Sequence, residues 1–251
     1  MTTIQRAYRR RSIAVAGGFE TVAAMEDDFH YFTVRLTHDG ERVTSITGDS
    51  IRYPWTTCPG AEARLQEMVG TPLRPGDGKA RFDVSQHCTH LFDVARFAVA
   101  QSVRGGRRQY DITIPDRDRI GGRTTAEILR DGIPVFRWSI DGLAVTAPSE
   151  FAGHSLAGRA VWPEGSIADD DALEAALMLR RALVIFRGRT SEYPAVMRAD
   201  HVPSVFGTCF TYQPENAPSG RWVMEEKDFS AGADAILADF DERLTLNRAT
   251  P

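Results

Sequence analysis

FHYFTVRLTHDGERVTSITGDSIRY, residues 29–53, consists of two segments in which apolar and polar side chains alternate. These segments, residues 29–36 and 42–53, are rich in β-branched residues, as half-buried strands are. Between them stands Asp39-Gly40, a dipeptide typical of the tight turn of a β-hairpin. The stretch therefore predicts two antiparallel strands joined by a short turn.

The same signals recur on both sides of this hairpin. Upstream, a β-branched segment alternates in the same way, and downstream the pairs Asp131-Gly132 and Asp141-Gly142 separate further strand-like segments. The strands expected in addition to the hairpin are residues 12–17, 110–114, 124–129, 135–140 and 143–147.

Helical spacing of apolar residues marks four more segments. A short helix is expected after Pro59 in TTCPGAEARLQEMVG, and a longer one is opened by QHCTHLFDVARFAV, residues 86–99. Residues 169–186 begin with three aspartates, which the dipole of a helix favours in its first turn. A last amphipathic helix is expected over residues 230–244. The proline-rich residues 202–221 are expected to form either a lid or a packed irregular segment.

Strand hairpins combined with a few helices indicate the fold class. Strands and crossover helices do not alternate regularly, so a parallel sheet is not expected. The sequence predicts an α+β protein with an antiparallel β-sheet and a few packed helices. A chain of 251 residues can bury one large core, so we expect a single domain over residues 1–251. The alternative is two joined halves, residues 1–105 and a strand-rich half, residues 106–251, with C-terminal helices.

Composition and charge exclude several classes of protein. The chain is 25% charged with a net charge of −4, whereas nucleic-acid binding usually requires a basic surface. We expect the basic residues 6–11, RAYRRR, to form a solvated or self-pairing arm. Three cysteines do not make a disulfide scaffold, and no apolar run suggests a membrane span. The first residues lack the apolar core of a signal peptide, so we expect a cytoplasmic protein that binds neither nucleic acid nor membranes.

Two histidines and a cysteine stand at the entrance of the helix expected after residue 86. Thr89 can cap this helix with its hydroxyl, which places His90 at the first helical position and Cys88 just outside. The positive end of a helix dipole disfavours an imidazolium and favours a thiolate. We therefore expect a neutral His90 that acts as a base or hydrogen-bond partner, and a thiolate at Cys88. The alternative is a buried histidine bonded to a loop carbonyl beside a small buried thiol.

Cys58 and His30 are expected in comparable surroundings. Pro59 suits the first position of a helix, so Cys58 or Thr57 would be its cap. Alternation places His30 on the inward face of its strand, where an imidazole needs a polar partner. One inward strand residue and two helix entrances commonly line one cleft. We therefore expect His30, Cys58 and His90 to share a pocket.

The same four side chains, His30, Cys58, Cys88 and His90, are also zinc-ligand types. Structural zinc sites usually pair their ligands as C-x-x-C or H-x-x-x-H, whereas the close pair in this chain is C-x-H. Metal binding therefore stays an alternative to core packing and to an acid–base role, and we expect no metal and no cofactor. The sequence contains no G-x-S-x-G, phosphate-loop, Rossmann glycine or H-E-x-x-H motif.

Three motifs in order carry a resemblance to a known family. FHYFTVRLTHDGERVTSI is followed by RYPWTTCPGA and then by CTHLFDVARFAVAQ. An early-strand histidine, an aromatic-x-x-Cys-Pro turn and a C-T-H-L helix start in this order resemble the bacterial domain-of-unknown-function 2889 family, over roughly residues 9–115. The chain departs from that pattern at His87, where a small residue, usually glycine, is expected, and in its long C-terminal half.

The resemblance implies a cofactor-independent carbon–carbon lyase. Relatives are associated with bacteria that degrade aromatic and lignin-derived compounds, and with the release of formaldehyde from a phenylcoumaran-type dimer. Such a reaction needs a base for the hydroxymethyl proton, stabilisation of charge that moves through a phenol, and an acid for the departing ring oxygen. Histidine, tyrosine and arginine suffice for these tasks.

Candidate residues for this chemistry lie within the region of resemblance. A histidine would be the base, a tyrosine the acid or phenol-oxygen partner, and Arg52 a clamp for a phenolate or carboxylate. The candidate catalytic residues are His90, His30, Tyr31 and Tyr53, and the candidate substrate-binding residues are Arg52, Cys58, Cys88 and Trp55. Aromatic residues that either line an apolar pocket or belong to the core are Phe29, Phe32, Trp55, Phe92, Trp138 and Trp162.

Three hypotheses about function follow from the sequence. The first is a lyase with a small aromatic substrate, for which we also expect a homo-oligomer. The second is a metal-dependent enzyme or metal-binding domain that uses the cysteines and histidines. The third is a non-catalytic binding module for a hydrophobic ligand or partner.

Overall fold

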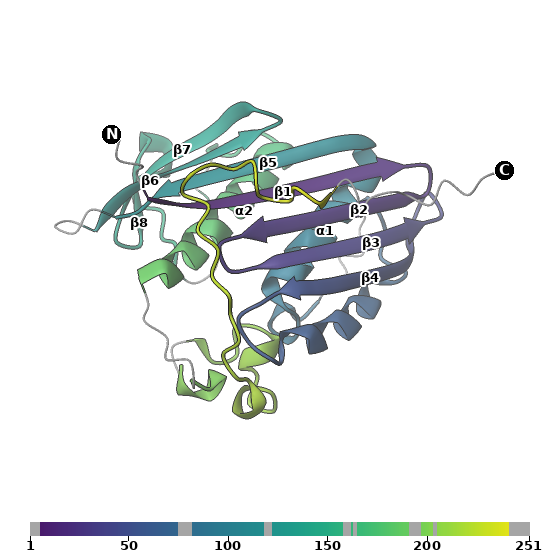
Figure 1. Cartoon of the computed structure of the whole chain (residues 1–251). Helices are drawn as coiled ribbons and strands as arrows, with labels where there is room; N and C mark the ends of the chain where they lie inside the picture. Colours follow the sequence, from purple (N-terminus) through teal and green to yellow (C-terminus); the bar gives the residue numbers. More distant parts are fainter. Residues whose placement is uncertain are drawn as a thin grey trace. The chain divides into compact units, whose positions relative to one another are not determined.

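A computed structural model describes residues 6–74, 82–117, 122–157, 162, 165–190, 197–202 and 205–240 of the chain. Its strands form an antiparallel sheet in the order β4-β3-β2-β1-β5-β6-β7-β8 (Figure 1). The prediction of an α+β fold with an antiparallel sheet is therefore confirmed. The strands are β1 (Ala7–Gly17), β2 (Glu20–Asp27), β3 (Tyr31–His38), β4 (Val43–Arg52), β5 (Gly106–Pro115), β6 (Arg123–Arg130), β7 (Ile133–Asp141) and β8 (Ala144–Ala147).

Helical segments connect and follow these strands. The α-helices are α1 (Thr89–Arg104) and α2 (Asp170–Phe186), and the 3-10 helices are η1 (Cys58–Met68), η2 (Val84–Gln86), η3 (Ser149–Phe151), η4 (Arg187–Thr190), η5 (Ala199–His201), η7 (Phe210–Tyr212) and η8 (Ala217–Ser219). None of the helices in the described part of the chain is long and apolar enough to cross a membrane.

The hairpin expected from the alternating stretch is formed by β3 and β4. Asp39 accepts hydrogen bonds from the backbone N–H groups of Glu41 and Arg42, at 2.8 and 2.7 Å. Gly40 adopts φ 99°, a left-handed conformation that glycine enters at little cost. The Asp-Gly turn and the antiparallel pairing are thus both confirmed.

The basic residues 6–11 do not form a solvated arm, so that expectation is wrong. Residues 7–11 are the first half of β1, which is an inner strand of the sheet, and Arg10 is buried. The place of β1 inside the sheet explains the difference, because both of its faces carry buried apolar residues, among them Ala7, Tyr8 and Ile13.

Strand β2 is an element that alternation does not predict. Its sequence ETVAAMED is buried at every position after Glu20. A strand buried on both faces gives a continuous apolar run, which lacks the period of two that identifies a half-buried strand.

The caps of the helices differ from expectation by one residue at α1. Cys88, in an extended conformation, is the N-cap of α1, so Thr89 is the first helical residue and His90 the second. At η1 the N-cap is Thr57, and the element is a 3-10 helix. The helix expected over residues 169–186 is confirmed as α2, and its N-cap is Asp169, whose carboxylate accepts from the N–H of Ala172 at 2.8 Å.

The C-terminal helix expected over residues 230–244 is not present over residues 230–239, which form turns and bends. Leu237 has φ 55°, which a helix does not accept, and its N–H donates to the Glu26 carboxylate at 2.7 Å. Residues 241–244 lie outside the described residues. In residues 202–221, the described part forms short 3-10 turns packed against Trp55, the second of the two structures expected there.

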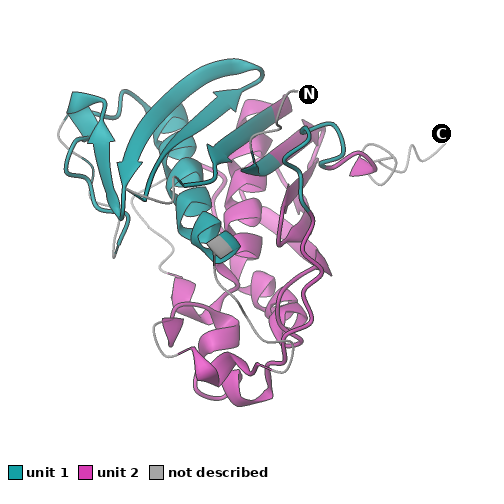
Figure 2. Ribbon diagram, turned by 60° about the vertical axis from the view of Figure 1, so that its left-hand side comes forward, with its two compact units in different colours: residues 1–11, 109–192, 228–236 teal, residues 12–108, 193–227, 237–251 magenta. Residues whose placement is uncertain are grey.

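The chain divides into two compact units, coloured separately in Figure 2. Unit 1 comprises residues 1–11, 109–192 and 228–236, and unit 2 comprises residues 12–108, 193–227 and 237–251. Strand β1 contributes its first residues to unit 1 and the others to unit 2. In unit 2, α1 packs on β2 and β3, and η1 packs on β4.

Candidate functional site

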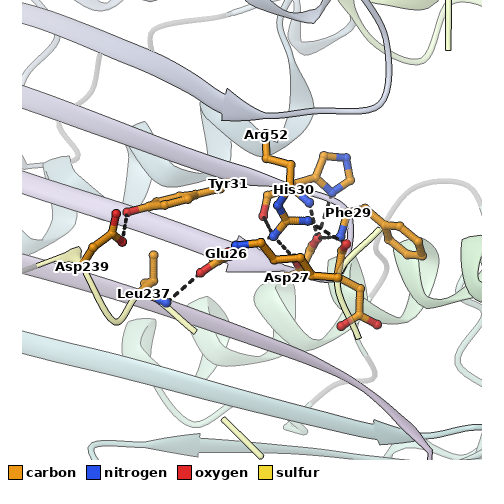
Figure 3. Close-up of polar contacts among 10 residues, drawn as sticks. Glu26, Asp27, Phe29, His30, Tyr31, Arg52, Leu237 and Asp239 are labelled. Atoms are coloured by element: carbon orange, nitrogen blue, oxygen red, sulfur yellow. Dashed lines mark hydrogen bonds and ion pairs between the residues drawn. The ribbon is translucent and has the colours of Figure 1, made fainter. Parts of the chain in front are cut away.

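Three consecutive acidic side chains, Glu26, Asp27 and Asp28, are buried where β2 turns into β3. One oxygen of Asp27, Oδ1, accepts hydrogen bonds from the backbone N–H groups of Phe29 and His30, at 2.8 and 2.7 Å (Figure 3). The N–H of Asp27 in turn donates to the carbonyl of His30 at 2.9 Å. An aspartate that bonds the backbone two and three residues ahead is a local turn former, so the sequence itself builds this turn.

His30 is paired with the same carboxylate. Its Nδ1 lies 3.0 Å from Asp27 Oδ1, and both side chains are buried. With Asp27 ionised, Nδ1 carries the proton in the neutral ring, because a carboxylate only accepts. This tautomer leaves the lone pair on Nε2, and the hydrogen bond fixes the orientation of the ring.

His90 stacks on His30. The ring centroids are 4.1 Å apart and the planes are inclined by 23°. The ring of Phe32 stacks with both imidazoles. Its centroid lies 5.8 Å from that of His30 and 6.3 Å from that of His90. A strand-entry histidine and a helix-entry histidine thus meet in unit 2, as expected for His30 and His90.

Arg52, expected to clamp a substrate, is occupied by the protein itself. Its guanidinium donates to the carboxylate of Glu26 at 2.9 Å and to the carbonyls of Asp27 and Asp28, at 2.6 and 2.7 Å. Glu26 also lies 3.4 Å from the ammonium of Lys227. Arg52 therefore holds the acidic turn in place and balances part of its charge.

Tyr31 points away from the histidine pair. Its hydroxyl donates to Asp239 at 3.0 Å, while Glu26 reaches the backbone of Leu237, as Figure 3 shows. These bonds attach the chain segment after residue 236 to the sheet. Tyr31 thus has a protein partner for the hydroxyl that was expected to serve as an acid.

Trp55 and Cys58 belong to a second cluster in unit 2, which we call the Trp55 cluster, together with Ala199 and Ala217. The indole N–H of Trp55 donates to the hydroxyl of Tyr212 at 3.0 Å. The partly buried side chains packed against this cluster are Tyr53, Met197, Val202, Tyr212 and Trp222. Tyr53, Trp55 and Cys58 are therefore grouped with one another in the Trp55 cluster. Cys58 also lies close enough to Cys88, the N-cap of α1, to raise the pKa of that thiol.

The thiols of Cys58 and Cys88 are buried and protonated. Burial raises the pKa of Cys58 to about 12, against a smaller lowering by its contact with the Thr211 hydroxyl, 3.5 Å from the sulfur. Burial also raises the pKa of Cys88, and the neighbouring thiols Cys58 and Cys209 act in the same direction. The expectation of a thiolate at Cys88 is wrong, because desolvation outweighs the N–H groups at the start of α1.

The cysteines and histidines do not converge as metal ligands. Within the residues that the structure describes, no three His, Cys, Asp or Glu side chains are arranged to hold a metal ion. His87, the departure from the family pattern, is buried with Nε2 3.2 Å from a carboxylate oxygen of Glu67. Its ring packs against Phe82 and Phe92.

A hollow of about 310 Å³ lies elsewhere on unit 2. It is lined by Val22, Thr33, Val34, Arg35, Asp49, Ile51 and Phe240. None of these is an expected site residue, so we place the candidate site by its chemistry, at the histidine pair.

The acidic turn is the part of the site that motif reasoning missed. The signal was present in MEDDFH, residues 25–30, where three acidic residues precede a histidine between two apolar segments. Recognising these residues required the strand β2, because only a strand on each side of the turn buries the carboxylates.

Fold and site define an α+β protein with an antiparallel sheet and a buried carboxylate–histidine pair stacked on a second histidine. Residues 10–103 match the family described as protein of unknown function (DUF2889). This segment contains His30, Arg52, Cys58, Cys88 and His90, and the resemblance expected from the three motifs is thereby confirmed. No curated protein matches the chain.

Proposed function

We propose that the chain is an enzyme that uses His30 and His90 for general acid–base catalysis. The reaction we propose is a cofactor-independent carbon–carbon cleavage that releases formaldehyde from a lignin-derived dimer of the phenylcoumaran type. The family resemblance suggests this reaction class. The observation that carries the acid–base assignment is the buried Asp27–His30 pair with the His90 ring 4.1 Å from that of His30.

His30 is the general base in this proposal. Asp27 holds its Nδ1, so Nε2 takes the proton from the hydroxymethyl group of the substrate. The Asp27 carboxylate then stabilises the imidazolium that forms on His30, as the aspartate does in other carboxylate–histidine pairs.

His90 is the hydrogen-bond donor to the ring oxygen that leaves in this proposal. As the hydroxymethyl O–H loses its proton, its C–O bond becomes the C=O of formaldehyde and the C–C bond breaks. The released electron pair forms a C=C bond with the adjacent ring carbon, whose bond to the ring oxygen breaks to give a phenolate. His90, at the second position of α1, stays neutral in the field of the helix and donates a hydrogen bond to that oxygen. The proton on His30 then returns to the phenolate, so the cycle is balanced.

The proposal also includes the kind of substrate and the location of the protein in the cell. A small aromatic substrate suits a site with Phe32 beside the histidine pair. A cytoplasmic location suits the thiols Cys58 and Cys88, because a reducing compartment keeps thiols from forming disulfides.

The test is the release of formaldehyde from a phenylcoumaran-type dimer by the purified full-length chain. We expect turnover by the parent and a loss of kcat/KM of about 10²- to 10⁴-fold in His30→Gln, because a general base contributes that much. The matched control is His201→Gln, whose side chain is 56% exposed, and which should keep the parent rate.

Two results would contradict the proposal. One is formaldehyde release by the parent no faster than in the enzyme-free solution. The other is a folded His30→Gln variant with the full rate of the parent, which would leave the histidine pair a structural feature.

A further inference from the structure

Arg10 in β1 has a buried charged side chain that plays no part in the proposed reaction. It is 2% exposed. Its Nε and Nη1 atoms have no hydrogen-bond partner among the residues that the structure describes. Within those residues no ion pair compensates the charge of its guanidinium.

The two neighbouring arginines of β1, in contrast, both have polar partners. Arg9 donates from Nη1 to the hydroxyl of Thr113 at 3.1 Å. Arg11 forms an ion pair with Asp111 at 2.6 Å and also reaches the carbonyl of Ile236. Side chains alternate between the two faces of a strand, so Arg10 leaves β1 on the face opposite to these partners.

Unit 1 covers that opposite face with α2. Tyr8, two residues before Arg10 and therefore on the same face, packs its ring edge-on against Phe186 of α2, with centroids 6.3 Å apart. On β5, the strand next to β1 in the sheet, the hydroxyl of Tyr110 donates to Glu174 of α2 at 2.9 Å. Figure 2 shows α2 lying along the strands of this unit. Arg10 thus leaves β1 on the face that α2 covers, with its Nε and Nη1 atoms buried.

An arginine in this position cannot relieve its burial by losing a proton. A lysine or histidine can become neutral when buried, but a guanidinium remains charged under all conditions in which proteins fold. A buried charge without a partner is strongly unfavourable, so an anion at this place would stabilise the fold. Carboxylates and phosphates are the anions that the planar donor set of arginine binds best.

We propose that Arg10 binds the carboxylate or phosphate group of an anionic ligand inside unit 1, on the α2 side of β1. The proposal does not depend on the lyase activity, because Arg10 belongs to unit 1 and the histidine pair to unit 2.

Unfolding of the full chain in matched salts tests this inference. Sodium phosphate, sodium acetate and sodium chloride are compared at equal ionic strength, with unfolding by urea as the readout. We expect phosphate or acetate to stabilise the parent in a saturable manner, with an about tenfold smaller unfolding constant when the anion is at about ten times its dissociation constant. A response to phosphate alone indicates a phosphorylated ligand, and a response to acetate alone a carboxylate.

Arg10→Met should abolish the response, because methionine keeps much of the volume of the side chain without its charge. The control Arg123→Met removes an arginine whose side chain is 73% exposed, and should respond as the parent does. If Arg10→Met does not fold, Arg10→Lys replaces it, and the saturation midpoint should then move to a higher anion concentration. A parent that responds alike to all three salts overturns the inference, and so does a response that survives in the Arg10 variant.

Discussion

At Asp27 a single carboxylate oxygen accepts two backbone N–H groups and the Nδ1–H of His30. The side chain has no exposed surface. Because hydrogen bonds to a charged acceptor are stronger than those between neutral groups, this residue stabilises the turn and the imidazole together. Residue 27 is therefore a positioning residue for His30 in the proposed reaction.

Replacement of Asp27 by asparagine should lower the free energy of unfolding by about 1–3 kcal/mol, the cost of leaving buried donors poorly satisfied. Asparagine has nearly the same shape, so the change removes charge without opening a cavity. Urea unfolding monitored by tryptophan fluorescence measures the loss. Asp49→Asn is the matched control, since Asp49 accepts an exposed hydrogen bond from Thr33 at 3.1 Å and should change stability by less than about 0.5 kcal/mol. Equal losses in the two variants would contradict a special role for Asp27.

The three thiols of the chain should react at different rates. Cys58 and Cys88 are buried with raised pKa values, whereas Cys209 is half-buried. Alkylation requires an accessible thiolate, so iodoacetamide at neutral pH should label Cys209 first in the native protein. Peptide mass spectrometry after timed quenching measures the order. Labelling of Cys88 ahead of Cys209 would show that the start of α1 stabilises a thiolate after all.

At the scale of elements, β4 meets both η1 and α1 at Gly48. A Cβ placed on this glycine would lie 2.7 Å from Leu65 Cδ1 and 3.0 Å from Leu91 Cδ1, distances that real Cβ atoms avoid. It would also lie 3.2 Å from the backbone oxygen of Thr33 in the neighbouring strand. The absence of a side chain at Gly48 thus lets one strand, one 3-10 helix and one α-helix pack together.

Gly48→Ala should therefore destabilise the protein by about 1–3 kcal/mol, the usual cost of overpacking a core. The matched control is Gly17→Ala, because a Cβ at Gly17 meets no atom within 4 Å. The control should stay close to the parent. Thermal unfolding of the three proteins side by side measures the difference, and a Gly48→Ala variant as stable as the control would mean that η1 or α1 shifts freely.

Elements with a local signal could be predicted, and those defined by their surroundings could not. The β3–β4 hairpin follows from alternation and Asp39-Gly40, and α2 follows from Asp169 and its apolar spacing. Strand β2 was not predicted, because both of its faces are buried and its sequence therefore does not alternate. The arginines of β1 indicated a solvated surface, because charge in a sequence does not reveal which strands will enclose it.

At the scale of the whole molecule, the candidate site depends on pairings between distant segments. His30 and His90 are 60 positions apart in the sequence and meet because α1 packs on β2 and β3. Residue types alone suggested that they could converge, but did not show that Cys58 packs in the Trp55 cluster. The stacking of the two histidines and the packing of Cys58 both follow from sheet register and helix packing, which a single sequence does not specify.

Stability of the whole molecule should fall at high pH because of its buried thiols. The pKa of Cys58 rises from an ordinary 9.0 to about 12 in the folded chain, so above pH 9 the unfolded chain releases a proton that the folded chain retains. The contribution of the protonated thiol is complete below pH 9 and is lost as the pH rises toward 12. The slope is about 1.4 kcal/mol per pH unit for each such thiol, and Cys88 acts in the same direction.

Cys58→Ala should therefore show a shallower decline than the parent, by about 2 kcal/mol between pH 9 and about pH 10.5. Tyrosine and lysine side chains titrate in this range in both proteins, so the difference between the two slopes isolates the thiol. Urea unfolding at a series of pH values measures it, and Cys209→Ala, which removes a half-buried thiol, is the control. Parallel slopes for the parent and Cys58→Ala would mean that the Cys58 thiol ionises in the folded chain as readily as in the unfolded one. Water would then have to enter the Trp55 cluster at high pH.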